Sequence, residues 1–159
     1  MARWHYLDPA LVWLFPAAYA AHLAEETFAG EGLRLWLGRL GPAPLSLAGF
    51  VVVNVVGMTV FVAGARLATR RQGFGWVAIS LSTIVLLNAV LHVLGTLVTR
   101  VYSPGLATAV VLYVPLGGLT ALRAATQAPA AEWQRGLAAG IVLQAAVSAL
   151  ALSGLLAGG

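Results

Sequence analysis

The feature that most constrains this chain is a series of five apolar stretches, each about as long as an α-helix needs to be to cross a membrane. They cover residues 9–28, 45–65, 74–98, 106–122 and 136–157. Only 9% of the residues are charged, against roughly 25% in soluble domains, so the chain has no polar helix faces to offer water. The sequence therefore predicts an all-α, polytopic membrane helix bundle with about five transmembrane helices, folded as a single domain over residues 1–159.

The remaining segments carry their own structural signals. Asp8 before Pro9 is typical of a helix start, and this pair, together with Pro16, disfavours the alternative of a cleaved signal peptide. Residues 30–40 mix leucines with two arginines in a piece too short to span, which predicts one short interfacial helix. The Pro-Leu-Gly-Gly sequence at 115–118 predicts a kink in the fourth span.

The arginines indicate an orientation in the membrane and argue against nucleic-acid binding. All nine basic residues are arginines, scattered near the ends of the apolar stretches as interfacial anchors are. Six are expected on the side of the N-terminus: Arg3, Arg66, Arg70, Arg71, Arg123 and Arg135. Three are expected on the other side: Arg34, Arg39 and Arg100. The positive-inside rule then places the N-terminus in the cytoplasm.

Ionisable side chains inside the predicted spans are the main functional signal, because each costs about 2.5–3.5 kcal/mol to insert. In the first span, His22 lies about one turn before Glu25 and Glu26. At about 100° per residue, the two carboxylates fall on either side of the histidine. We therefore expect these three side chains to converge on one point.

A second polar group lies at the same expected depth. In the third span, Asn88 and His92 are four residues apart and share a helix face. His22 and His92 are about equally far from the outer ends of their spans, so we expect them at one level in the outer half of the bilayer. Asn54 reaches a similar depth, and the Tyr-Ser-Pro-Gly turn at 102–105 closes the same side.

Each of these residues also has a plainer interpretation. Glu25 and Glu26 would be interfacial charges near a helix end, and Asn88 and His92 would form interhelical hydrogen bonds. Interhelical bonding is the preferred interpretation of two further polar residues, Asn54 and Gln144. The coincidence of two histidines, two glutamates and an asparagine at one depth favours a functional site.

At these residues the sequence resembles the HXXEE-domain family of bacterial integral membrane proteins. Residues 22–26 match its HxxEE motif, residues 88–92 its NxxxH motif and residues 102–105 its YxPG motif. The resemblance implies a bacterial inner (plasma) membrane protein whose motif residues are suspected of catalysis, with no established substrate. A looser similarity is to the intramembrane glutamate proteases that process prenylated proteins, whose second histidine motif and larger helix count are absent here.

We expect a membrane-embedded enzyme, most simply a hydrolase of a lipid or other apolar substrate. Because the chain has no cysteine, a metal must be held by other ligands, and His22, Glu26 and His92 would bind a divalent ion, with zinc favoured. The other carboxylate, Glu25, would act as general base, and Asn88 or Tyr102 would stabilise a developing oxyanion. In a metal-free variant, either glutamate would activate water directly.

Other functions stay open at this point. The same acid/base pair would serve a lipid isomerase or cyclase, and a non-enzymatic metal- or proton-coupled carrier or binding subunit would also need polar groups at this depth. The expected partners are membrane lipids and an apolar or lipid-like substrate, with no nucleic acid, and the oligomeric state is left open.

Overall fold

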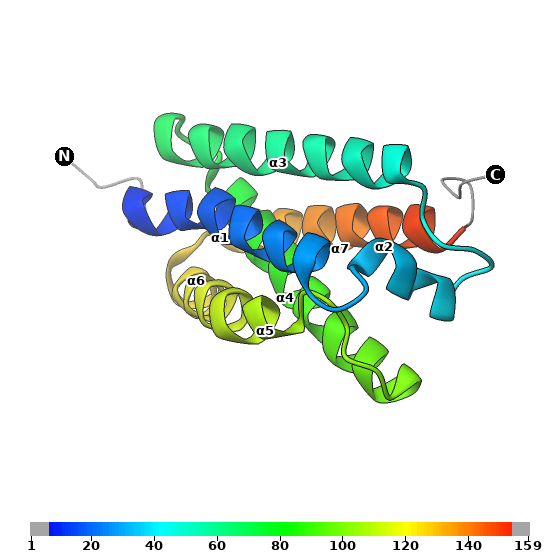
Figure 1. Cartoon of the computed structure of the whole chain (residues 1–159). Coiled ribbons are helices and arrows are strands. Elements are labelled where there is room, and N and C mark those ends of the chain that lie inside the picture. The colour runs from blue at the N-terminus through cyan, green and yellow to red at the C-terminus, as the bar shows by residue number, and fades with distance from the viewer. Residues whose placement is uncertain (1–6, 154–159) are drawn as a thin grey trace.

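The computed structural model describes residues 7–153, and the regular elements in this range are all helical (Figure 1). They are α1 (Pro9–Phe28), α2 (Leu33–Trp36), the 3₁₀ turn η1 (Leu37–Arg39), α3 (Leu47–Arg70), α4 (Gly75–Thr99), α5 (Leu106–Thr108), the π-helical turn η2 (Ala109–Tyr113), α6 (Val114–Gln127) and α7 (Ala130–Leu152). The predicted all-α class is confirmed. Arg3 and the last residues of the predicted fifth span, 154–157, lie outside the described residues.

In the part of the chain that the structure describes, four helices are long and apolar enough to cross a membrane, as expected of a membrane protein. They are α3, α4, the continuous helix Leu106–Gln127 formed by α5, η2 and α6, and α7. The remaining predicted span is α1, which has 20 residues but contains two prolines, a histidine and two glutamates that lower its hydropathy. It packs against α3 on one side and against α4, α5 and α6 on the other (Figure 1). The predicted count of about five is therefore close.

The helices extend further than the apolar stretches that predicted them. α3 continues from Ala65 to Arg70, the fourth predicted span continues to Gln127, and α7 begins at Ala130 and not at residue 136. The prediction placed each of these three limits beside an arginine, Arg66, Arg123 or Arg135, whereas a long arginine side chain on a helix can extend to the membrane interface.

The direction of each helix follows from its contacts. Tyr19 on α1 donates a hydrogen bond to Asn54 on α3, at 2.9 Å, and Phe15 packs in one cluster with Phe61, so α1 and α3 are antiparallel. On α4, Leu81 lies in the cluster of Phe15, and His92 lies beside His22, so α1 and α4 run in the same direction. The C-terminal halves of α1 and α4 therefore end on the same side of the bundle.

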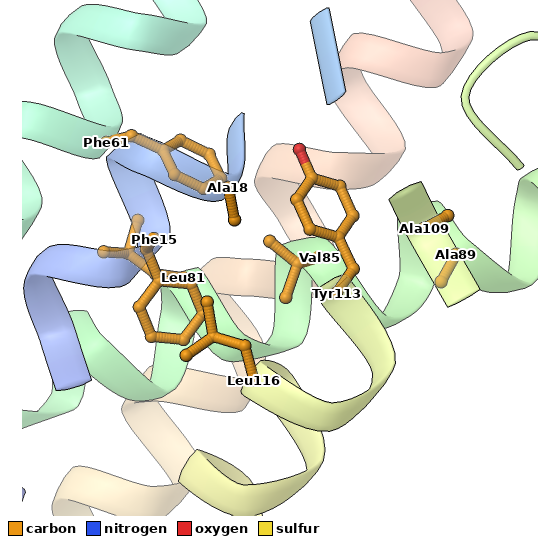
Figure 2. Packing of buried hydrophobic residues seen from close by; sticks show 9 residues of the cluster. All are labelled: Phe15, Ala18, Phe61, Leu81, Val85, Ala89, Ala109, Tyr113 and Leu116. Carbon is orange, nitrogen blue, oxygen red and sulfur yellow. The ribbon is translucent and has the colours of Figure 1, made fainter. Parts of the chain in front are cut away.

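The main hydrophobic core lies where α1, α3, α4 and the η2–α6 helix meet. Figure 2 shows this core cluster, which consists of Phe15, Ala18, Phe61, Leu81, Val85, Ala89, Ala109, Tyr113 and Leu116. Phe15 and Val85 are completely inaccessible to solvent. The ring of Tyr113 extends the cluster toward the polar residues, because its centroid lies 4.4 Å from that of the His22 ring.

Small residues bring α7 close to α4. A Cβ atom on Gly136 would lie 2.5 Å from Cβ of Ile79, and one on Gly140 would lie 2.5 Å from Cβ of Thr83. Glycines four residues apart commonly allow such close approach between membrane helices. This packing fixes α4, and with it His92, against the bundle.

In place of the predicted kink at 115–118, the helix has an irregular turn just before residue 115. Residues Ala109–Tyr113 form a π-helical turn, η2, immediately before Val114 and Pro115. Proline has no N–H to donate to the carbonyl of residue 111, so the distortion falls in the preceding turn. On the proline's other side, Ser82 donates a hydrogen bond of 2.8 Å to the carbonyl of Gly117.

The predicted interfacial helix at 30–40 is found as α2 and η1. Trp36 is buried and its ring lies against Gly95 of α4, where a Cβ atom would come within 2.5 Å of the indole. Arg39 pairs with Glu31 at 2.7 Å on the exposed side. This segment therefore packs on the same end of α4 as His92.

Candidate metal centre

The centre of the polar group is a buried trio of His22, Glu26 and His92. Oε1 of Glu26 lies 3.2 Å from Nε2 of His22 and 3.4 Å from Nε2 of His92. One potential ligand atom from each residue lies within 4.8 Å of the others. The three residues are only 2%, 7% and 5% exposed, respectively. This His/Glu/His group could bind a metal ion.

Helix geometry explains how the trio forms. His22 and Glu26 are four residues apart on α1 and share one of its faces. His92 is supplied by α4, and its ring meets that of His22 edge to face, with centroids 4.9 Å apart. The predicted proximity of the two histidines is confirmed.

The other nitrogen of each imidazole is held by a hydroxyl group. Nδ1 of His22 lies 2.8 Å from Oγ1 of Thr108, and Nδ1 of His92 lies 2.8 Å from Oγ of Ser103. Ser103 is itself fixed through its backbone N–H, which donates to Thr96 at 3.0 Å. Both histidines therefore direct Nε2 toward Glu26.

Glu25 points away from Glu26 and binds the segment after α4. Its Oε2 accepts the backbone N–H of Thr108 at 2.7 Å and the hydroxyl of Thr108 at 2.5 Å. Its Oε1 accepts the backbone N–H of Ala107 at 3.0 Å and the hydroxyl of Tyr102. Glu25 thus connects to His22 through Thr108, whereas the sequence predicted that both carboxylates would converge with the histidine on one point.

Tyr102 lies in the loop between α4 and α5 and is the most exposed residue of the group, at 45%. Its partial burial and its hydrogen bond to Glu25 raise the pKa of the Tyr102 phenol above its ordinary value. The phenol therefore keeps its proton, and its ability to donate a hydrogen bond, throughout the neutral pH range.

Gly105 lies directly against the two imidazoles. Its φ is +105°, as the predicted turn requires, and a Cβ atom there would lie 2.6 Å from Cε1 of His92 and 2.8 Å from Cε1 of His22. Only a residue without a side chain lets the loop pass so close to both rings. The turn therefore covers the centre.

The other predicted polar residues are placed differently. Asn54 accepts the hydroxyl proton of Tyr19 and donates to the carbonyl of Phe50 at 2.9 Å. Gln144 donates to Ser148 within α7 at 3.2 Å. Oδ1 of Asn88 is buried without a hydrogen-bond partner in the part of the chain that the structure describes. The trio, Glu25 and Tyr102 are thus brought together, while hydrogen bonds join none of these amides to the trio.

Three residues near the centre were not singled out from the sequence. Ser103 lies inside the predicted turn, but its spacing gave no reason to pair it with His92. Thr108 and Tyr113 belong to the predicted fourth span, where a lone hydroxyl is common and carries no signal by itself. Only the docking of the helix beginning at Leu106 against α1 shows what they contact.

A comparison with known protein families identifies the family of this chain. The model of the HXXEE family, described as protein of unknown function with HXXEE motif, matches residues 13–120. This range includes the trio, Glu25 and the loop that covers them. Searches of the curated proteins and of the solved structures give no match. Because the family model matches well over half of the chain, the protein belongs to the HXXEE family.

Proposed function

We propose that the protein is a membrane-embedded, metal-dependent hydrolase of a lipid or another apolar substrate. The observation that carries the proposal is the convergence of two imidazole Nε2 atoms on one carboxylate oxygen, at 3.2 and 3.4 Å, in a buried site. Placing ionisable side chains in lipid is costly, so such clusters at membrane depth generally serve a function.

The ligand set suits a divalent transition metal, with zinc favoured. Two imidazoles and one carboxylate are a common set for catalytic zinc, which keeps a further position for water. A tetrahedral ion with bonds of about 2.0–2.2 Å holds its ligand atoms roughly 3.3–3.6 Å apart. Both separations from Glu26 lie at or near this range, and all three ligand atoms lie within 4.8 Å of one another.

The bound ion would supply a water molecule of lowered pKa and would polarise the bond to be cleaved. Both contacts of Glu26 with the histidines use Oε1, so Oε2 is the proposed acceptor of a proton from water. The Tyr102 hydroxyl, once released from Glu25, is the proposed donor to a developing oxyanion. Asn88 is a second candidate for that role.

The geometry supports a different role for Glu25 than for Glu26. All four donors that bind Glu25 would have to be displaced before it could act as a base. We therefore assign Glu25 the role of ordering the covering loop and the start of the following helix.

The proposed setting is the bacterial inner membrane, with the N-terminus in the cytoplasm. The helix directions put Arg66, Arg70, Arg71, Arg123 and Arg135 at the end of the bundle where α1 begins. The positive-inside rule favours the cytoplasm for that end, which puts the trio in the outer half of the bilayer.

Turnover by purified protein tests the proposal. Protein in lipid nanodiscs would be stripped with a chelator, reloaded with zinc and assayed on panels of lipid esters, amides and phosphodiesters. Activity that needs the metal and is lost in Glu26→Gln, but kept in the surface control Glu31→Gln, would support it. Metal-dependent flux into sealed vesicles without hydrolysis would contradict the hydrolase proposal and favour a carrier.

A further inference from the structure

We propose that Thr108 is a positioning residue that selects which nitrogen of His22 binds the metal. Its hydroxyl, held by Glu25, fixes the proton of the imidazole on Nδ1 and leaves the lone pair on Nε2. This inference rests on the metal-binding role proposed above and identifies a residue on another helix as a requirement for it.

The number of protons around Oγ1 of Thr108 fixes the direction of its hydrogen bond with His22. The Thr108 hydroxyl has a single proton, which it donates to Oε2 of Glu25 at 2.5 Å, with the carbonyl of Gly105 at 3.2 Å as a second acceptor. Oγ1 of Thr108 therefore has only lone pairs to offer Nδ1 of His22, 2.8 Å away. A contact of that length needs a proton, so Nδ1 of His22 supplies it.

A proton on Nδ1 of His22 determines the state of Nε2, on the opposite side of the imidazole ring. A neutral imidazole with its proton on Nδ1 has an unprotonated Nε2. Nε2 of His22 is buried and has no hydrogen-bond partner among the described residues, although Oε1 of Glu26 is only 3.2 Å away. Two lone pairs that face each other at this distance repel, and a cation between them turns the contact into a favourable one. A metal ion held between Nε2 and Oε1 would supply that positive charge, as a proton on Nε2 would in the metal-free protein.

Glu25 holds Thr108 in the position from which it accepts the Nδ1 proton of His22. It accepts both the backbone N–H and the hydroxyl of Thr108, so the main chain and the side chain are fixed by one carboxylate. These contacts lie in the first turn of the long helix Leu106–Gln127, where N–H groups have no partner within the helix. The result is a chain of contacts from Glu25 through Thr108 to His22 and the trio.

Hydrogen-bond acceptors next to a ligating histidine affect the metal affinity of known sites. A ligating histidine usually donates its second N–H to a fixed acceptor, and losing that acceptor typically lowers metal affinity about 10–100-fold. Valine has the shape of threonine without the hydroxyl, whereas serine keeps the hydroxyl and loses only a methyl group. Thr59 is a matched control, because it is exposed on α3 and its hydroxyl bonds only within its own helix, to Val55.

The test is a competition titration of Zn²⁺ against a chromophoric chelator, using the full chain in detergent. Thr108→Val is expected to bind Zn²⁺ about 10–100-fold more weakly than wild type. Thr108→Ser and Thr59→Val should stay close to wild type. If Thr108→Val binds as tightly as wild type, or Thr108→Ser binds as weakly as Thr108→Val, the positioning role is overturned while the metal site stands. If wild type binds no metal, the proposed function fails as well.

A second measurement does not depend on the Thr108 variants. In ¹⁵N NMR spectra of histidine-labelled wild type loaded with Zn²⁺, His22 should carry its proton on Nδ1 and bind the metal through Nε2. A proton on Nε2 would overturn the proposal even if Thr108→Val failed to fold.

Discussion

Glu25 binds Thr108 through both its backbone N–H, at 2.7 Å, and its hydroxyl, at 2.5 Å, although 83 residues separate the two in the chain. The contact joins the end of α1 to the first turn of the helix that begins at Leu106. A carboxylate at a helix N-terminus is favourable because it meets unpaired N–H groups and the positive end of the helix dipole. The bonds that assemble the bundle here are therefore the bonds that hold His22 in place.

Replacing Glu25 by glutamine should destabilise the protein. The new amide group would turn two of its own protons toward groups that are themselves donors, and the charge that strengthened four hydrogen bonds would be lost. Hydrogen bonds to charged groups are worth about 1.5–3 kcal/mol, so a clear drop in the melting temperature in detergent is expected.

Glu31→Gln is the control for this change. Glu31 pairs with Arg39 on the exposed side, where an ion pair contributes about 0–1 kcal/mol, so its melting temperature should barely change. Equal melting temperatures for Glu25→Gln and Glu31→Gln would contradict the role assigned to Glu25.

Gly105→Ala should damage both stability and metal binding. Its φ of +105° is strained for alanine, by about 1–3 kcal/mol, and the added Cβ would press on the Cε1 atoms of His22 and His92. Gly118→Ala is the matched control, because it is helical with open space around it and should stabilise by roughly 0.5–1 kcal/mol. Thermal melts and Zn²⁺ titration would compare the two, and a Gly105→Ala protein that binds Zn²⁺ like wild type would contradict the close packing of the loop.

The trio was largely predictable, because its geometry follows from regular helices. The spacing of His22 and Glu26 fixes their shared face, and counting residues from the span ends puts His92 at the same depth. Asn88 shares the face of His92, but four residues along a helix amount to about 6 Å, and its Oδ1 is not hydrogen-bonded to the trio. Residue spacing predicts the direction of a side chain around the helix and its depth along the helix axis. A residue joins a site only when both its direction and its depth agree with those of the other members.

The contacts of Glu25 were less predictable. Its neighbour Glu26 points into the bundle. The direction of the Glu25 side chain depends on which segment packs beside it. That partner is a backbone segment, Ala107 and Thr108, whose free N–H groups exist because a helix begins there. The start at Leu106 was predicted, but nothing local showed that it docks on α1.

Single cysteines test the orientation, since the chain has none of its own. With the N-terminus in the cytoplasm, Glu31→Cys should react with an impermeant thiol reagent added outside intact cells. Gln72→Cys and Gln127→Cys, at the opposite end of the bundle, should react only after the membrane is opened. The reverse pattern would invert the orientation, and accessibility of Gln72 and Gln127 from opposite sides would contradict the helix directions.

X-ray absorption at the zinc edge tests the central claim most directly, because it identifies the ligands of the metal itself. Wild type loaded with one equivalent of Zn²⁺ should show two imidazole ligands and a carboxylate oxygen at about 2.0–2.2 Å. His22→Ala and His92→Ala should each lose one imidazole from the spectrum. A wild-type spectrum without imidazole scattering, or one that neither substitution changes, would contradict a metal centre built from His22, Glu26 and His92.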